Sequence, residues 1–226
     1  MYLEYLKSKL MKKMPLKICG ITNVKSVEMA HKNKIKSLGF ASKNLNGPNT
    51  VSDKKIQSLI KECKNYKIES VLLTQYVSLD KLIEQIDFTK PKTISCSFHF
   101  SKAKLEIIRN TFKKLRIGIA VNPENFNISY IKSIKNIVNV IYYDLNVYKT
   151  KSIRKYSLKK NLDQINWIKG LKIPIFIGGG INQNNVSEII NSVRPDGLDI
   201  SRSLKNSKNI LSPKKLNSFL SQISVA

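Results

Sequence analysis

The sequence of 226 residues is poor in the residue types that mark secreted and membrane-spanning proteins. It holds three cysteines, Cys19, Cys63 and Cys96, and no CxxC spacing, which favours a reduced protein over a disulfide scaffold. No apolar run approaches the roughly 20 residues of a membrane span. The first residues also lack the apolar core and cleavage site of a signal peptide. We therefore expect a cytoplasmic protein without membrane contact.

Acidic residues are scarce as well, and so is arginine. The chain has 40 Lys and Arg residues against 15 Asp and Glu, for a formal net charge of +25, yet only five of the basic residues are arginine. Arginine is the residue that binds bases and phosphates through two parallel hydrogen bonds. Lysine is dispersed along the chain and accompanied by much Ile and Asn, whose codons are also rich in A and U. We interpret the charge as codon bias and expect no specific nucleic-acid partner, whereas an anionic small molecule remains compatible with it.

Two further motifs are missing. No GxGxxG follows the first predicted strand, which disfavours an open dinucleotide-binding sheet. No HxH pair or carboxylate cluster is present, so the sequence gives no reason to expect a metal-dependent epimerase.

Strand-like and helix-like segments instead alternate eight times along the chain. Strands are predicted at 16–19, 37–41, 69–74, 93–97, 117–121, 138–144, 173–178 and 197–201. Helices are predicted at 24–33, 53–65, 79–86, 102–114, 129–136, 158–170, 184–192 and 213–223, with N-caps at Asn23, Ser52, Ser78, Asn182 and Ser212. Short strands rich in Val, Ile and Leu indicate burial on both faces, and eight such units favour closure of the sheet. We predict a single (β/α)8 TIM barrel over residues 15–226.

A short basic extension over residues 1–14 precedes the predicted barrel. It is amphipathic and ends at Met14, just before the first strand. Two interpretations stay open: Met14 is the true start of the protein, or the extension is a short helix that covers the barrel floor.

Six motifs, in this order, resemble those of phosphoribosylanthranilate isomerases. They are LKICGITN at 16–23, SLGF at 37–40, PNTVS at 48–52, VIYYD at 140–144, PIFIGGGINQNN at 174–185 and VRPDGLDIS at 193–201. The resemblance covers the chain from about residue 16 to its end. It implies a TIM-barrel isomerase of tryptophan biosynthesis that uses no cofactor and no metal. It also implies a small phosphorylated substrate, and a monomer or homodimer.

The resemblance further implies an acid and a base. The family reaction is an Amadori rearrangement of N-(5'-phosphoribosyl)anthranilate, in which an acid opens the furanose ring and a base removes a proton from the adjacent carbon. By resemblance Cys19 is the base and Asp144 the acid. Taken alone, Cys19 would be interpreted as a small core residue and Asp144 as a turn residue. Cys19 needs a positive field to lose its proton, and burial against Tyr142 and Tyr143, or against neighbouring strands, would help Asp144 to keep one.

A glycine-rich turn after the seventh predicted strand favours phosphate binding. Backbone N–H groups in such a turn, followed by a helix that starts near Asn182, can point at an anion. The loops after the seventh and eighth strands often hold phosphate in barrels of this kind. The alternative is a plain tight turn. The predicted phosphate site consists of Gly178, Gly179, Gly180, Ser201, Arg202 and Ser203.

Several positions depart from the family pattern. The family carries an arginine after the second strand that binds the anthranilate carboxylate, and Asn49 stands in its place, with Lys43 nearby as a possible substitute. Asn49 is still expected to contact the substrate through its amide. Residues 145–155 replace a glycine-rich phosphate loop and contain no glycine; their charges are Lys149, Lys151, Arg154 and Lys155.

Two further departures affect the fourth and eighth strands. The family's Gln-Leu-His-Gly run is replaced by Ser-Cys-Ser-Phe at 95–98, with His99 two positions late. Its Ser-Ser-Gly-Val-Glu run is replaced by Ser-Arg-Ser-Leu-Lys at 201–205. Three hypotheses follow: a working isomerase, a non-catalytic or substrate-shifted relative that binds a phosphorylated ligand or a partner, and a different phosphosugar isomerase or epimerase on the same barrel. The presence of both Cys19 and Asp144 favours the first.

Overall fold

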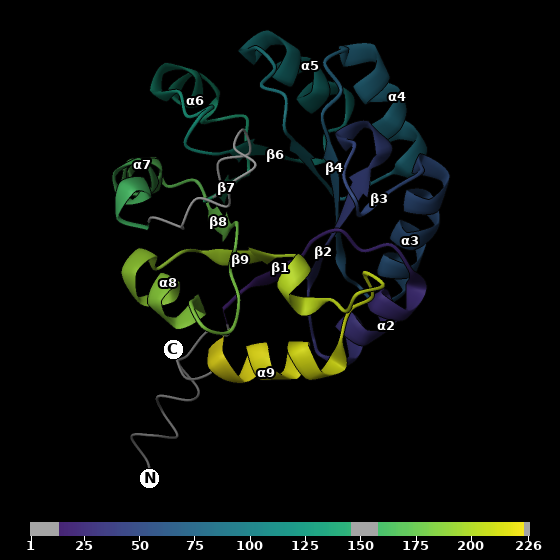
Figure 1. The fold of residues 1–226 in the computed structure, drawn as a ribbon. Coiled ribbons are helices and arrows are strands. Elements are labelled where there is room, and N and C mark those ends of the chain that lie inside the picture. Colours follow the sequence, from purple (N-terminus) through teal and green to yellow (C-terminus); the bar gives the residue numbers. More distant parts are fainter. Residues whose placement is uncertain (1–13, 146–157, 224–226) are drawn as a thin grey trace, which may run out of the picture.

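The computed structural model describes residues 14–145 and 158–223, and of residues 158–160 the backbone alone. In this part of the chain a ring of strands is surrounded by helices (Figure 1). The strands are β1 (Leu16–Ile18), β2 (Ser37–Ser42), β3 (Thr50–Val51), β4 (Glu69–Thr74), β5 (Thr93–Cys96), β6 (Arg116–Val121), β7 (Val140–Asp144), β8 (Ile175–Gly178) and β9 (Gly197–Ile200). The helices are α2 (Val24–Lys32), α3 (Asp53–Asn65), α4 (Leu79–Thr89), α5 (Lys102–Thr111), α6 (Ile128–Ile134), α7 (Leu158–Gly170), α8 (Val186–Val193) and α9 (Pro213–Ile223). Two 3-10 turns, η1 (Lys43–Leu45) and η2 (Arg202–Leu204), follow β2 and β9.

The sheet closes into a barrel. The strand order is β1-β9-β8-β7-β6-β5-β4-β2, and β1 also pairs with β2. At this closure Lys17 of β1 is in parallel register with Ser37 of β2 on one side and with Asp199 of β9 on the other. The two-residue strand β3 is added to the end of β2. The predicted (β/α)8 barrel is therefore confirmed, whereas the predicted extension lies outside the described residues except for Met14.

The helix starts follow from local side chains, with one correction. The side chains of Asn23, Ser52, Ser78 and Ser212 accept a hydrogen bond from the backbone N–H three residues later, as expected of N-caps. Asn182 is not a cap, because α8 begins at Val186 after Asn185. The Asn182 side chain instead accepts from the N–H of Asn184, two residues on, at 2.8 Å, an arrangement in which Asn favours a turn over a helix.

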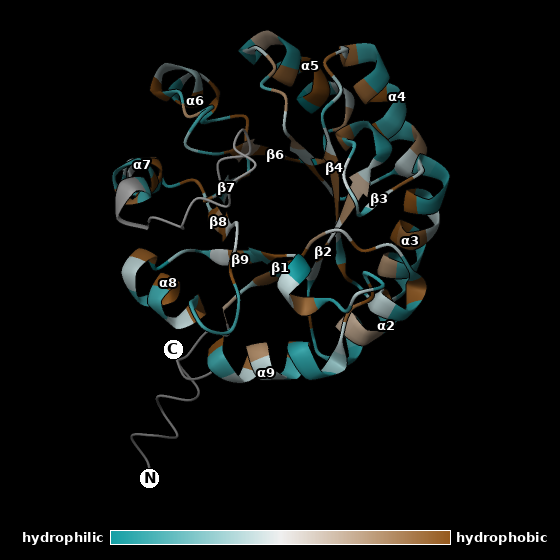
Figure 2. Ribbon diagram, viewed as in Figure 1, coloured by the Kyte–Doolittle hydropathy of each residue, from teal (hydrophilic) through white to brown (hydrophobic). Residues whose placement is uncertain are grey.

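Apolar side chains fill two separate layers. The larger layer lies between the strands and the surrounding helices and consists mainly of Ile and Leu. Figure 2 shows the matching pattern, with hydrophobic colours on the strands and hydrophilic colours on the outer sides of α3 and α4. The smaller layer fills the inside of the barrel with Val71, Val140 and Tyr142, against which Leu73 and Phe176 pack. No helix in the described ranges is long and apolar enough to cross a bilayer.

Candidate active site

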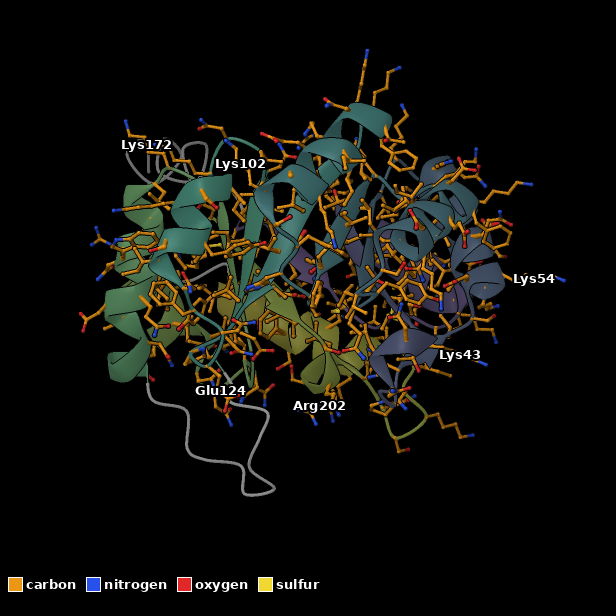
Figure 3. The ribbon with its side chains drawn as sticks, turned by 90° about the horizontal axis from the view of Figure 1, so that it is seen from above. Lys43, Lys54, Lys102, Glu124, Lys172 and Arg202 are labelled. Atoms are coloured by element: carbon orange, nitrogen blue, oxygen red, sulfur yellow. The ribbon has the colours of Figure 1, made fainter. Side chains whose placement is uncertain are left out.

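The loops that follow the barrel strands share one face of the molecule. Figure 3 shows the side chains of Lys43, Glu124 and Arg202 on one side and that of Lys172 on the other. Lys43 follows β2, Glu124 follows β6 and Arg202 follows β9, whereas Lys172 lies between α7 and β8. Catalytic groups of (β/α)8 enzymes lie on the face formed by the loops after the strands, so this face carries the candidate active site.

Cys19 follows β1 and faces the inside of the barrel at this face. Lys17 points inward, because its Nζ donates to Asp199 Oδ2 at 2.6 Å and lies 4.2 Å from the centre of the Tyr142 ring. Side chains alternate along a strand, so Cys19 points in the same direction one layer higher. Its backbone N–H donates to the carbonyl of Ile200 at 2.7 Å and extends the β1–β9 pairing.

Asp144 reaches the same layer from β7. Tyr142 contacts Lys17 inside the barrel, and a step of two residues along each strand leads from Tyr142 to Asp144 and from Lys17 to Cys19. Alternation therefore places the carboxyl and the thiol at the same level of the barrel mouth. Tyr143 lies on the outer face of β7, where its hydroxyl donates to Gln164 Oε1 of α7 at 2.6 Å. The expectation that Asp144 is buried against both tyrosines is wrong for Tyr143, whose side chain lies on the other face of the strand. Asp144 itself is partly exposed.

Two glycines make room for the Cys19 turn. At Gly39 of β2, a Cβ atom would lie 3.0 Å from Cys19 Sγ, closer than ordinary van der Waals contact. Gly20 has a φ of +68°, and a Cβ there would lie 2.9 Å from Lys205 Nζ and 3.0 Å from Asn49 Cβ. A side chain at either position would displace the thiol or its turn, which explains the Cys-Gly pair in physical terms.

Charged groups around Cys19 act on its pKa in opposite directions. Burial raises the pKa of the Cys19 thiol to about 11, with a smaller rise caused by the Asp199 carboxylate. The cations Lys17 and Lys205 lower it. The positive field that the sequence suggested is present, but burial outweighs it in the ligand-free structure, so Cys19 is largely protonated at neutral pH.

Lys205 is a buried cation beside this turn. Its side chain is 2% exposed, and its Nζ donates to the carbonyl oxygen of Gly20. Burial lowers the pKa of Lys205 to about 8, while Cys19 and Asp199 act to raise it. The sequence identified position 205 only as a departure from the family pattern, because the 185 residues that separate Lys205 from Gly20 hide their contact.

Lys17 and Asp199 form a second feature that sequence reasoning missed. The Lys17 side chain is fully buried, and Asp199 Oδ1 is buried without a hydrogen-bond partner among the described residues. The attraction of Asp199 raises the pKa of Lys17 above its usual range, although burial alone would lower it. A lysine inside the LKICG strand was the available signal, because the neighbouring buried positions of that strand are apolar.

The predicted phosphate residues come together at the ends of β8 and β9. Gly179 and Gly180 have φ angles of +89° and +74°, so the backbone turns sharply after β8. The Ser203 hydroxyl donates to the Ile181 carbonyl at 2.8 Å and joins η2 to this turn. Arg202 is exposed on the same face (Figure 3).

Four backbone N–H groups of this region donate to no backbone carbonyl among the described residues. They are those of Gly179, Gly180, Arg202 and Ser203. The N-terminus of α8 contributes less than expected, because the helix begins at Val186, after the Asn182 turn. A phosphate cradle here would therefore depend on the turn and on η2 rather than on a helix end.

Asn49, which stands where the family carries an arginine, is a buried residue. It is 9% exposed, and its Oδ1 has no hydrogen-bond partner among the described residues. Lys43 on η1 is exposed on the same face (Figure 3). Asn49 Cβ and Lys205 Nζ both border the space into which a side chain at position 20 would project, so the Asn49 side chain and the buried cation lie close to the same turn.

Other departures lie farther from this turn or outside the described residues. His99 Nε2 is 2.9 Å from the carbonyl oxygen of Ala120, and its ring stacks on Tyr130 with centroids 4.8 Å apart. Cys96 is buried in β5. The cations predicted within residues 145–155 fall in the undescribed stretch. Within the described ranges, no group of three His, Cys, Asp or Glu side chains is arranged to hold a metal.

The chain is therefore a closed (β/α)8 barrel with a thiol, a carboxyl and a glycine-rich turn at its mouth. No protein-family model matches it. It is 23% identical over 220 residues to N-(5'-phosphoribosyl)anthranilate isomerase 2 of Methanosarcina mazei, covering 92% of each chain. It is 26% identical over 225 residues to N-(5'-phosphoribosyl)anthranilate isomerase of Methanocaldococcus jannaschii, covering 92% of this chain and 96% of the relative.

Solved structures share the fold. N-(5'-phosphoribosyl)anthranilate isomerase from Pyrococcus furiosus matches with a TM-score of 0.73 at 20% identity, over 94% of this chain and 100% of that one. At this identity the structural match supports the fold alone. Along most of its length the chain is similar, at 23–26% identity, to phosphoribosylanthranilate isomerases.

Proposed function

We propose that the protein isomerises N-(5'-phosphoribosyl)anthranilate to the corresponding 1-amino-1-deoxyketose, a step of tryptophan biosynthesis. The observation that carries the proposal is the shared level of Cys19 and Asp144 at the barrel mouth, two residues above the contact between Lys17 and Tyr142. The reaction needs an acid and a base on opposite sides of one sugar, and these two side chains come from different strands, β1 and β7.

Asp144 and Cys19 act in sequence on the sugar. The carboxyl of Asp144 gives its proton to the furanose ring oxygen as the bond from that oxygen to C1' breaks, which leaves a Schiff base. The thiolate of Cys19 then takes the proton from C2', and the electron pair of the C–H bond forms the enolamine. A proton added to C1' and loss of the proton from the C2' hydroxyl complete the ketone.

The phosphate and the anthranilate contact separate parts of the mouth. The turn at Gly179 and Gly180, together with η2, supplies N–H donors and the charge of Arg202 to the phosphate. Asn49 contacts the anthranilate carboxylate through its amide NH2, a weaker interaction than an arginine would make. The free energy from the phosphate contacts thus has to compensate for the weak carboxylate contact.

Turnover by the purified protein tests this proposal. The substrate is supplied at millimolar concentration, product is measured by chromatography, and growth of a tryptophan auxotroph that lacks the isomerase is scored in parallel. Product and growth are expected from the wild-type chain and not from Cys19→Ala. Phosphate binding without any turnover, also in Asn49→Arg, would favour the non-catalytic relative instead.

A further inference from the structure

Lys205 has an unusual position for a lysine. Its side chain is almost fully buried, its backbone N–H donates to the Arg202 carbonyl at 3.1 Å, and its carbonyl accepts from Lys215 Nζ at 2.7 Å. It also forms an antiparallel bridge with Leu211. The main chain of Lys205 is thus held from several sides, so its ammonium has a fixed location against the Gly20 carbonyl.

Among the described residues, no carboxylate is recorded in an ion pair with this ammonium. The carboxylate that acts on Lys205 is Asp199, whose Oδ2 is already bound to Lys17 at 2.6 Å. Isolated charges are costly to bury. A buried cation against the turn of a reactive thiol is a device by which proteins stabilise thiolates.

We propose that Lys205 is a positioning residue for Cys19: its ammonium holds the Cys19–Gly20 turn and stabilises the thiolate form of the base. The part concerning catalysis rests on the proposed function, and the part concerning the thiolate does not. Lys17 and Asp199 act on the same thiol in opposite directions, since the cation favours the thiolate and the carboxylate disfavours it. Lys205 adds a further positive charge at the Gly20 turn.

Two titrations are coupled in this arrangement. Among the described residues, the charged groups that act on Cys19 are Lys17, Asp199 and Lys205, and those that act on Lys205 are Cys19 and Asp199. The pKa of Lys205 is about 8 and that of Cys19 about 11. As the pH rises through 8, Lys205 loses its charge and the Cys19 thiolate loses its stabilising partner. The reactivity of Cys19 should therefore increase more slowly with pH in this interval.

The rate of Cys19 alkylation by iodoacetamide measures this coupling without any turnover. Rates are determined between pH 6 and 10 on the full chain, with the modified peptide identified by mass spectrometry, since Cys63 and Cys96 are buried. In the wild type the logarithm of the rate should rise by less than one unit per pH unit between about pH 7 and 9. In Lys205→Met it should rise with unit slope throughout.

The size of the effect follows from the loss of a neighbouring charge. Removal of an opposite charge shifts a pKa by about one unit or more, so the thiolate fraction at pH 7 falls about tenfold. A more basic thiolate is a better nucleophile, which offsets part of this loss and leaves a fall of about threefold in the alkylation rate. The kcat of Lys205→Met should fall by a similar factor, because proton abstraction depends on both the thiolate fraction and the basicity of the thiolate.

Lys208→Met is the matched control, because it removes one exposed positive charge from the same loop and should leave both profiles unchanged. Lys205→Gln is the second variant should Lys205→Met fold poorly, and the bend in the wild-type profile tests the coupling without any variant. A wild-type profile of unit slope, or a variant profile that superimposes on it, overturns the proposal. If the wild type proves inactive on the substrate, the alkylation profiles alone decide the role of Lys205, and the isomerase assignment fails separately.

Discussion

The side-chain layers on the two faces of the barrel sheet differ in composition and in role. The outer layer, between the strands and the helices, is filled mainly by Ile and Leu side chains. In the inner layer, inside the ring of strands, Tyr142 also contacts the ion pair of Lys17 and Asp199. Burial of apolar groups stabilises without specifying a chemistry. The inner layer sets the level and the electrostatic field of the groups above it. Variants that separate these two roles give the sharpest test of the comparison.

The largest expected effect lies at the top of the inner layer. Cys19→Ala and Asp144→Asn should each lower kcat by about 10² to 10⁴, the usual contribution of a general acid or base. The melting temperature and the affinity for inorganic phosphate should change little, because neither side chain belongs to the turn at Gly179. Steady-state kinetics and thermal melts with phosphate measure these effects.

Cys63→Ala on α3 is the control for that prediction. It removes a thiol that is fully buried in the outer layer, so it should lower stability and leave kcat unchanged. Loss of turnover in Cys63→Ala, or full turnover in Cys19→Ala, would mean that the thiol above the inner layer is not the base.

The ion pair of Lys17 and Asp199 should come next in effect. Lys17→Met leaves the largely buried Asp199 carboxylate, 16% exposed, without its partner, and the loss of such a partner lowers the free energy of unfolding by up to about 3–5 kcal/mol. The double variant Lys17→Met/Asp199→Leu should recover much of this loss because no charge remains buried. Urea denaturation at pH 7 measures both.

Leu59→Ala supplies the comparison for the outer layer. Leu59 is fully buried on α3, and its truncation should cost about 2–5 kcal/mol, similar to the ion-pair variant. Lys17→Met should change the alkylation rate of Cys19, and Leu59→Ala should not. Equal alkylation rates in the two variants would contradict a special electrostatic role for the inner layer.

The phosphate turn predicts a smaller, ligand-dependent effect. At a phosphosugar concentration 100 times its dissociation constant, binding should stabilise the native state by about 2.7 kcal/mol. Gly179→Asp should abolish that gain, because a carboxylate at the positive-φ turn repels the anion and strains the backbone. Thermal melts over a range of ligand concentrations provide the measurement.

Gly170→Asp adds the same charge at an open position, where no described atom lies within 4 Å of the added Cβ. Its thermal shift with ligand should equal that of the wild type. A retained shift in Gly179→Asp would place the phosphate elsewhere.

The sequence predicted the outer layer well and the inner layer poorly. The bounds of α3, β4, α7 and α9 follow from periodicity and capping residues, which act within a few positions. The strand β3 was missed, because two residues carry no periodic signal. The contact between Lys17 and Asp199 joins residues 182 positions apart, and the contact between Lys205 and Gly20 joins residues 185 apart. Such contacts depend on barrel closure, which local patterns do not encode.

The same limit explains the mixed outcome at the candidate site. The predicted phosphate residues come together, since the loops after neighbouring strands β8 and β9 must meet. The N-cap of α8 is Asn185, three residues after the predicted Asn182, because Asn signals both a cap and a turn. The roles of Cys19 and Asp144 stay predictions that rest on the resemblance and on their shared level.

The smallest expected effect concerns the missing arginine. Asn49→Arg should lower KM by about tenfold and leave kcat nearly unchanged, because a charge-assisted bond to a carboxylate is worth about 1.5–3 kcal/mol and the lower end of that range corresponds to about tenfold. Asn49→Gln lengthens the side chain without a charge and should leave KM near the wild-type value. Both variants are compared by steady-state kinetics with and without the phosphate group on the substrate. Lys205 Nζ borders the same space beside Gly20 as Asn49 does, so the added cation should also lower the melting temperature slightly. A fall in kcat as large as the fall in KM would mean that the new guanidinium disturbs the Cys19 turn. An unchanged KM would mean that the anthranilate carboxylate does not approach the loop after β2.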